Sequence, residues 1–428
     1  MIKKQFTQLK NNPRAKQVLG LFSVNIIGIP IGIITSIVIT RYLGAQGFGD
    51  YKFILSIFNL AIIIFSFGFF QAGNRALVLN NDKQKAKEYY GAELVITVGM
   101  FIVMSVFLVL YALFDNNIQE KHLDRFLLFV IPFGWIFLLS NYFETLFQAD
   151  NRIRMLGEFR LYPKVGFLIS AIILYLVFMD TKTDTNKLAI VYGLYLLTEV
   201  IVYIIILRKL HVSFQNLKIR FNEIWNYNRS FGFNVYVGSL FAVGFSQLTE
   251  VLISYFGVNN SGVGFYSLAI TFTMPLTFIP NTIATTHYKG FSTSDKISGK
   301  LLLITIVLSV SALVCLWLLV PPFVKYFYGH EFNSVVTLNF IVSIGVIAHG
   351  FGDFYNRYLG ANGQGKALRN SSFFVGGSMM LFNLLFIPKW GETGAAYARL
   401  ITGFIYLVII MKYYLQYIKS NHPNVEKL

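Results

Sequence analysis

The chain of 428 residues is 55% hydrophobic and only 13% charged, whereas a soluble domain is about a quarter charged. With a mean hydropathy of +0.59, a water-soluble fold of this size has too little interior to hide its apolar surface. The formal charge of +16 comes from short basic runs between apolar stretches. This pattern is typical of cytoplasmic loops of membrane proteins and argues against a nucleic-acid partner.

Residues that usually hold metals or cofactors are sparse. The six histidines have no metal-ligand spacing, and the single cysteine, Cys315, lies in an apolar run. We therefore expect no metal site, no disulfide and no cofactor. The basic N-terminal stretch lacks the apolar core and cleavage site of a signal peptide, so residues 1–17 are predicted to lie along the anionic cytoplasmic lipid surface.

Twelve apolar runs approach the roughly twenty residues that a membrane-spanning helix needs, which predicts an all-α polytopic membrane protein. The predicted spans are 18–40, 51–72, 91–114, 124–147, 165–180, 187–207, 230–256, 263–286, 301–321, 334–357, 373–388 and 394–417.

The basic residues predict the orientation of these spans. If the N-terminus is cytoplasmic, the cytoplasmic segments hold more than three times as many Lys and Arg residues as the outer segments, so both termini are predicted to be cytoplasmic. Residues 208–229 then form a cytoplasmic linker between an N-lobe of spans 1–6 (18–207) and a C-lobe of spans 7–12 (230–417). Residues 418–428 are predicted to be a cytoplasmic tail.

The chain resembles itself at an offset of about half its length. The turns after spans 1 and 7 match, as do the turns after spans 4 and 10. The matched pairs are Gly44 with Gly257, Gly49 with Gly264, Tyr51 with Tyr266, and 148–152 with 360–364. Because matched turns keep the same side of the membrane, the predicted repeat is parallel, and transporters built from repeats bind substrate between the halves for alternating access.

Short motifs along the chain resemble those of one transporter family. They are Arg41-Tyr-Leu-Gly44 with Phe48-Gly49-Asp-Tyr51, Gly264-Phe-Tyr266-Ser267-Leu-Ala269 before Pro275, Tyr328-Gly329-His-Glu-Phe332, and Leu359-Gly-Ala361-Asn-Gly-Gln-Gly-Lys366 followed by Asn383, Ile387-Pro388 and Gly391-Glu-Thr-Gly394-Ala395-Ala396. The chain thus resembles the polysaccharide flippases of the multidrug/oligosaccharidyl-lipid/polysaccharide exporter superfamily. The resemblance implies twelve spans, a central cavity and an undecaprenyl-pyrophosphate-linked glycan as cargo. Glu250 departs from the family, which often has aspartate there.

Ionisable residues inside the predicted spans cost about 2.5–3.5 kcal/mol each on insertion scales, so they indicate a partner or a wet cavity. His349, Asp353 and Arg357 share one face of span 10; this fits a cavity wall or an intrahelical Asp–Arg pair. Glu250 is either a proton or cation site or a partner of Arg399. The ion-coupling candidates are Glu250, Asp353, Glu199 and Glu144, and Glu93 is a further carboxylate within a predicted span.

A site for the cargo implied by the resemblance needs arginine side chains, whose planar guanidinium groups bind pairs of pyrophosphate oxygens. It also needs side-chain amides to hydrogen-bond the sugar hydroxyls. The predicted substrate-binding residues are Arg41, Arg75, Arg357, Arg399, His349, Asn25, Asn59, Asn141 and Asn383. No catalytic residue is predicted, because the expected activity is transport.

We expect a flippase of the bacterial inner membrane that moves lipid-linked oligosaccharide to the outer leaflet for O-antigen, capsule or exopolysaccharide synthesis. Membrane lipid, sodium or protons, and polysaccharide polymerase machinery are its expected partners. A cation-coupled multidrug exporter of the same superfamily is one alternative, although its cavity should be more acidic. A membrane polymerase or glycosyltransferase is a second alternative, but it would need a large outer or polar loop that the sequence lacks.

Overall fold

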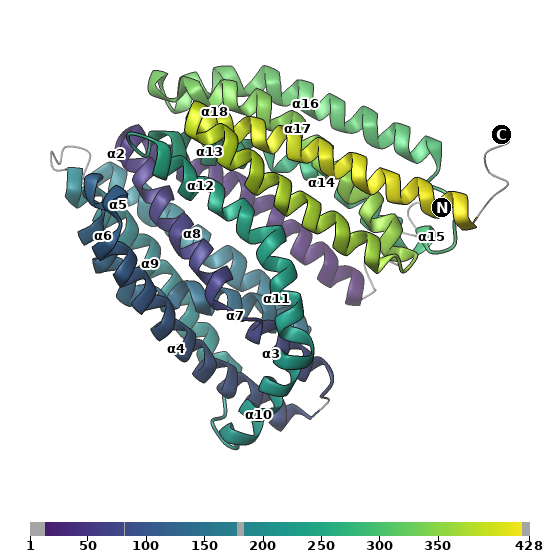
Figure 1. The fold of residues 1–428 in the computed structure, drawn as a ribbon. Coiled ribbons are helices and arrows are strands. Elements are labelled where there is room, and N and C mark those ends of the chain that lie inside the picture. The colour runs from purple at the N-terminus through teal and green to yellow at the C-terminus, as the bar shows by residue number, and fades with distance from the viewer. Residues whose placement is uncertain (1–12, 81, 178–183, 422–428) are drawn as a thin grey trace. The chain divides into compact units, whose positions relative to one another are not determined.

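The computed structural model describes residues 13–80, 82–177 and 184–421, and nearly all of them are helical, with no strand among them (Figure 1). The predicted cytoplasmic segment 1–17 and tail 418–428 lie largely outside these ranges. The α-helices are α2 (Pro13–Phe65), α3 (Phe69–Val78), α4 (Lys83–Phe114), α5 (Asn116–Glu120), α6 (Asp124–Val130), α7 (Trp135–Ala149), α8 (Ile153–Val177), α9 (Asp184–Leu210), α10 (Leu217–Tyr227), α11 (Phe233–Ser239), α12 (Phe245–Phe256), α13 (Ser261–Thr273), α14 (Pro275–Thr286), α15 (Tyr288–Phe291), α16 (Gly299–Phe327), α17 (Asn333–Ala361) and α18 (Gly365–Asn421). Short 3₁₀ helices occur at η1 (Ile131–Phe133) and η4 (His330–Phe332), and π-helical turns at η2 (Asn228–Gly232) and η3 (Leu240–Gly244).

The described helices form two compact units. Unit 1 runs up to Gly44 and continues over Ile57–Val237, and unit 2 comprises Ala45–Ser56 and the chain from Gly238 onward. Unit 2 therefore includes a short segment from within the residues assigned to the predicted N-lobe. The predicted linker 208–229 lies wholly in unit 1 and includes α10.

Eight described helices are long and apolar enough to cross a membrane, and α6 with α7, bent by 46°, would make a ninth. Along α4, every exposed side chain from Val95 to Phe114 is apolar. These twenty residues extend about 30 Å, the thickness of the hydrocarbon core. The chain is a multi-pass membrane protein, while the count of twelve spans and the cytoplasmic location of the termini stay predictions.

Two helices are far longer than one membrane crossing requires. α2 has 53 residues and α18 has 57, against roughly twenty for a single span. Each is interrupted by a glycine with positive φ, Gly44 at 71° and Gly391 at 54°. The two predicted outer turns at these positions are thus sharp breaks within long helices rather than extended loops.

Several predicted spans are not straight. The run 51–72 is broken at Gly68, whose φ is +81° and whose missing Cβ would lie 2.4 Å from the carbonyl oxygen of Gly232. Pro275 starts α14 and divides the run 263–286. Hydropathy averages over such breaks, because it records how apolar a stretch is and not its backbone conformation.

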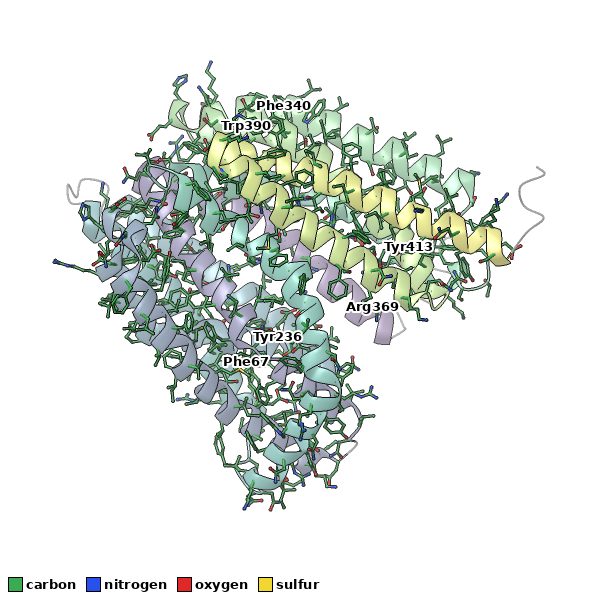
Figure 2. All side chains as sticks on the ribbon, viewed as in Figure 1. Phe67, Tyr236, Phe340, Arg369, Trp390 and Tyr413 are labelled. Carbon is green, nitrogen blue, oxygen red and sulfur yellow. The ribbon has the colours of Figure 1, made fainter. Side chains whose placement is uncertain are left out.

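Aromatic side chains pack between the helices (Figure 2). Near the break at Gly68, the rings of Phe67 and Tyr236 lie 6.1 Å apart, and the Tyr236 hydroxyl donates to the carbonyl of Ile64 at 2.7 Å. In unit 2, Trp317 packs against Phe340. These contacts hold irregular stretches of helix in place, such as α11 against the break between α2 and α3.

One predicted repeat match has the same backbone geometry in both copies. The Arg152 amide donates to the Phe147 carbonyl at the end of α7, and the Gln364 amide donates to the Leu359 carbonyl at the end of α17, each at 2.9 Å. The residue before each donor has positive φ, 53° at Asn151 and 72° at Gly363. This shared helix-ending motif supports the predicted repeat. The other match differs, since Gly44 has positive φ and Gly257 is extended.

Candidate functional site

Unit 2 contains a polar cavity of about 330 Å³ among α12, α13, α14, α17 and α18. Three of the predicted site residues, Glu250, Asp353 and Arg399, contribute its charged lining. The remaining lining residues are Ser246, Gln247, Tyr266, Ile270, Thr273, Met274, Thr277, Asn281 and Val346. Residues more than a hundred positions apart in the sequence thus converge on one space.

Close helix packing places Arg399 in this cavity. A Cβ on Gly345 of α17 would lie 2.8 Å from the Arg399 carbonyl, and one on Gly403 of α18 would lie 2.2 Å from the Gly345 carbonyl. Small residues allow such close approach between membrane helices. The Arg399 Nε–H is buried and donates to no acceptor among the described residues, although a buried donor normally has a partner.

Asp353 is anchored by neutral groups. Its Oδ1 accepts from the Tyr406 hydroxyl at 3.1 Å and its Oδ2 accepts from Asn281 Nδ2 at 3.4 Å. His349, one turn earlier on α17, packs its ring 4.6 Å from that of Tyr406. Arg357, one turn later, is exposed and does not line the cavity. Of the three predicted residues on this face of α17, only Asp353 lines the cavity. His349 and Arg357 lie one turn away on either side of it.

Glu250 has a charged neighbour that sequence reasoning missed. Lys52 interacts with Glu250 electrostatically, and Ser267 hydrogen-bonds the same carboxylate. Lys52 belongs to the segment 45–56 that packs in unit 2, where Gly49 contacts the backbone of Asn260. Lys52 lies at the start of the predicted span 51–72 and is not among the predicted site residues. The repeat match of Gly49 with Gly264 was a signal for this docking, because the two glycines pack against each other.

Unit 1 contains a second cluster of charges, on α2, α7, α8 and α9. The guanidinium of Arg160 forms an ion pair with Glu144 and donates to Asn25 Oδ1 at 3.3 Å. Lys164, one turn along α8, interacts with Glu199 and lies beside Gly28. Three predicted residues (Asn25, Glu144 and Glu199) meet here. The predicted span 165–180 began too late to place Arg160 and Lys164 on a membrane helix.

The other predicted residues do not join either cluster in the described contacts. Arg41, Asn59 and Arg75 are exposed and Asn141 is half-buried, while Arg75 lies over the ring of Phe231. Asn383 is buried and donates to Thr249 Oγ1 at 2.8 Å, linking α18 to α12.

Glu93 is buried as well, and both of its carboxylate oxygens lack a donor among the described residues. It packs against Gly73 of α3, so it belongs to the helix packing of unit 1 rather than to the cluster around Arg160.

The sequence profile of the family described as "Polysaccharide biosynthesis protein" matches residues 15–292. The chain belongs to this family. The match includes Glu250 and Asn281 of the cavity lining and Lys52, which interacts with Glu250, and it ends before Asp353 and Arg399. The chain is also 21% identical over 415 residues to the capsular polysaccharide biosynthesis protein CapF of Staphylococcus aureus, covering 92% of this chain and 97% of that protein.

Two groups of solved structures share the fold of this family member. The lipid II flippase MurJ in an inward closed conformation has a TM-score of 0.73 at 14% identity, covering 94% of this chain and 89% of its own. An inward-facing multidrug resistance MATE transporter of the MOP superfamily has a TM-score of 0.67 at 12% identity, covering 96% and 99%. At these identities the likeness concerns the fold alone.

Proposed function

We propose that this protein is a flippase that moves undecaprenyl-pyrophosphate-linked oligosaccharide from the cytoplasmic to the outer leaflet during surface polysaccharide synthesis. The observation that carries the proposal is the unpartnered, buried Nε–H of Arg399 in the polar cavity of unit 2. A guanidinium is a forked donor for phosphate oxygens. Membership of a polysaccharide biosynthesis family supports a glycan-linked substrate for that donor.

The neighbouring charges suggest how substrate entry and ion binding are coupled. Lys52 acts electrostatically on Glu250, and Arg357 and Arg399 act on Asp353. A pyrophosphate that recruits Arg399 and Lys52 would leave the two carboxylates with less counter-charge in a poorly solvated site. Glu250 and Asp353 would then bind protons or sodium, which lowers the cost of two buried negative charges.

Alternating access supplies the movement in this proposal. Twelve spans form two six-helix lobes with both termini in the cytoplasm, and the cavity opens to each side of the inner membrane in turn. The polar cluster around Arg160 in unit 1 supports its own lobe. A MurJ-like fold is compatible with a large amphipathic cargo, because the structure that shares it is named as a lipid II flippase.

One observation favours a second candidate, a cation-coupled multidrug exporter. The fold is also shared with MATE transporters, and Glu250 and Asp353 would suit a cationic drug. Arg399 and Lys52 oppose this reading, because each would repel such a substrate. The alternative predicts export of drugs and no change in surface polymer on deletion.

The test is deletion of the gene in its host, followed by assignment of undecaprenyl-linked glycans to a leaflet with a membrane-impermeant glycan-modifying reagent. Complete repeat units protected on the cytoplasmic side, together with lost surface polymer, support flipping. Complementation with the native chain should restore both, and an Arg399→Gln chain at equal abundance should not. Unchanged lipid pools and polymer would refute the proposal.

A further inference from the structure

An amphipathic helix, α10 (Leu217–Tyr227), lies outside the membrane-spanning candidates of unit 1. Its buried residues are Arg220 and Ile224. Large aromatic side chains are exposed on it and just before it: Phe214 by 59%, Phe221 by 43% and Trp225 by 44%. A water-facing surface seldom gathers such residues without a partner.

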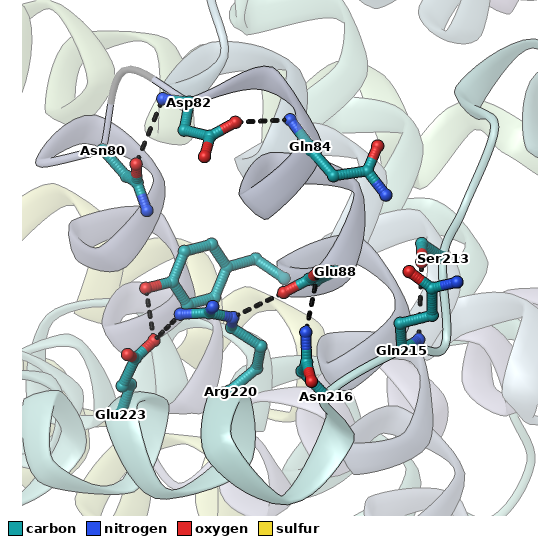
Figure 3. A network of polar contacts seen from close by, with 10 residues as sticks. Asn80, Asp82, Gln84, Glu88, Ser213, Gln215, Asn216, Arg220 and Glu223 are labelled. Carbon is teal, nitrogen blue, oxygen red and sulfur yellow. Dashed lines mark hydrogen bonds and ion pairs between the residues drawn. The ribbon is translucent and has the colours of Figure 1, made fainter.

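A polar network fixes the orientation of α10 against the start of α4 (Figure 3). Arg220 donates from Nε to Glu88 at 2.8 Å and from its terminal nitrogen to Glu223 at 2.6 Å. Tyr89 donates to Glu223 at 2.6 Å, and Asn216 donates to Glu88 at 3.1 Å. The Arg220 side chain is 10% exposed and that of Glu88 is 6%, so the polar face of the helix is closed. The aromatic residues stay partly exposed, although Trp225 also packs against Phe69 of α3.

The same contacts set the height of α10 along α4. Glu88 precedes Val95, the first lipid-facing residue of α4, by seven positions, or about 10 Å of helix. The Ser213 amide donates to the Lys87 carbonyl at 3.0 Å, and the ring of Phe214 lies beside Gly91, one turn from Val95. The headgroup region on each side of the hydrocarbon core is roughly 5–8 Å thick. Phe214, about 6 Å of helix from Val95, therefore falls within the headgroup thickness, and the contact of Arg220 with Glu88 lies just beyond its outer edge.

The exposed flank of α10 combines aromatic rings with cations. Phe221 and Trp225, one turn apart, stack with ring centroids 6.3 Å apart. Lys218 and Arg229 are exposed and occupy the preceding and following turns of the same flank. Aromatic rings favour the membrane interface and basic side chains favour anionic headgroups.

We propose that Phe214, Phe221 and Trp225 insert into the headgroup region of an anionic leaflet, with Lys218 and Arg229 on lipid phosphates. On the predicted topology this is the cytoplasmic leaflet. The contact holds the chain that leads from unit 1 to unit 2 against the membrane surface. It stands independently of the transported substrate, since it rests on the packing of α10 against α4 and α3.

Paired spin labels test this assignment in the full chain. In a Cys315→Ser background, nitroxides are attached at Phe221→Cys and Trp225→Cys, with the adjacent Asn222→Cys and Asn226→Cys as matched controls. In nanodiscs containing phosphatidylglycerol, labels at 221 and 225 should collide more with oxygen, and those at 222 and 226 more with a water-soluble nickel chelate. Equal access of the chelate to all four sites would overturn the proposal in favour of a soluble partner.

A second comparison tests the lipid charge. The label at 221 should move toward water when phosphatidylglycerol is replaced by phosphatidylcholine, and Lys218→Gln with Arg229→Gln should remove that difference. An equal depth in both lipids would overturn the assignment to anionic headgroups. Monodisperse elution shows that each variant is folded, and none of these substitutions touches Arg220, Glu88 or Glu223.

Discussion

The Arg160 cluster of unit 1 and the cavity of unit 2 each place cations and carboxylates among apolar helices, but their charged groups are hydrogen-bonded differently. In unit 1, two nitrogens of Arg160 bond Glu144, and a third contacts Asn25. In unit 2, Arg399 keeps a buried donor without an acceptor among the described residues, while Asp353 is hydrogen-bonded by neutral groups. Each nitrogen of the Arg160 guanidinium therefore has a protein acceptor, whereas Arg399 keeps a hydrogen-bond donor that a ligand can use.

This difference separates a structural role from a binding role. A satisfied ion pair holds helices in register, and its donors must lose a partner before they can bind anything else. An unsatisfied guanidinium beside a cavity gains from an incoming oxyanion. Variants in the two units should therefore affect different quantities: abundance and stability for unit 1, and transport per molecule for unit 2.

The largest expected effect is the loss of transport in Arg399→Gln. One charge-assisted hydrogen bond contributes about 1.5–3 kcal/mol, so transport should fall at least about tenfold. Surface polymer in the complemented deletion strain, normalised to protein in the membrane, measures this. Arg399→Lys keeps the charge without the fork and should recover part of the activity.

The matched arginines sharpen the comparison. Arg357→Gln, on the same face of α17 as Asp353 but exposed, should lower transport less than Arg399→Gln. Arg160→Gln should lower protein abundance rather than transport per molecule. Equal transport defects in Arg160→Gln and Arg399→Gln at equal abundance would contradict the division of roles between the units.

A second effect concerns ion coupling. Glu250→Gln removes a carboxylate that faces Lys52 and the cavity, so stimulation of transport by an imposed proton or sodium gradient should be lost in proteoliposomes. Glu199→Gln in unit 1 is the control and should keep the stimulation. Loss in the control alone would move the coupling site to unit 1.

Part of this site could be predicted from the sequence, because charge inside an apolar run is visible without a fold. Glu250, Asp353 and Arg399 were found in this way. Tyr406 and Asn281 were not, since a tyrosine or an asparagine in a membrane helix has many roles until a carboxylate is known to face it. Lys52 was missed because docking of the segment 45–56 depends on tertiary contacts.

The fold shows the same limit. The lengths of the apolar runs predicted a membrane helix at each of the membrane-spanning candidates among the described residues. Apolar length missed the start of α8. Arg160 and Lys164 have carboxylate partners inside the protein, but their polarity lowers the hydropathy of this stretch to that of a loop. It also missed the break at Gly68, because that depends on close contact with Gly232.

A smaller effect tests the closed cluster of unit 1 directly. The side chains of Arg160 and Glu144 are 29% and 30% exposed, so their coupling should be about 0.5–1 kcal/mol, as for measured pairs in membrane proteins and at surfaces. A double-mutant cycle of Glu144→Gln and Arg160→Gln, followed by thermal unfolding in detergent, measures it. Transport per molecule should stay near the native level, and a coupling of zero would mean that the pair does not hold α7 to α8.

The smallest expected effect is a pH dependence of the α10 network, another closed charge cluster of unit 1. Burial raises the pKa of Glu223, but hydrogen bonds from Tyr89 and Arg220 outweigh it and leave the pKa below its ordinary value. A lowered pKa means that the folded state favours the ionised form. Its stabilisation is therefore complete at neutral pH and is lost as the pH falls through the folded pKa, below about 4.3.

The side chain of Glu223 is 37% exposed, so solvent screening should keep this contribution under about 1 kcal/mol. The measurement is the difference in thermal midpoint between the native chain and Glu223→Gln, taken at pH 7 and again near pH 3.5. The native chain should be the more stable at pH 7, and the difference should shrink on acidification because protonated glutamate and glutamine are both neutral. A difference that grows on acidification would show that Glu223 is not held as an anion by Arg220, and the network of α10 would then lack the closed pairing seen in the Arg160 cluster.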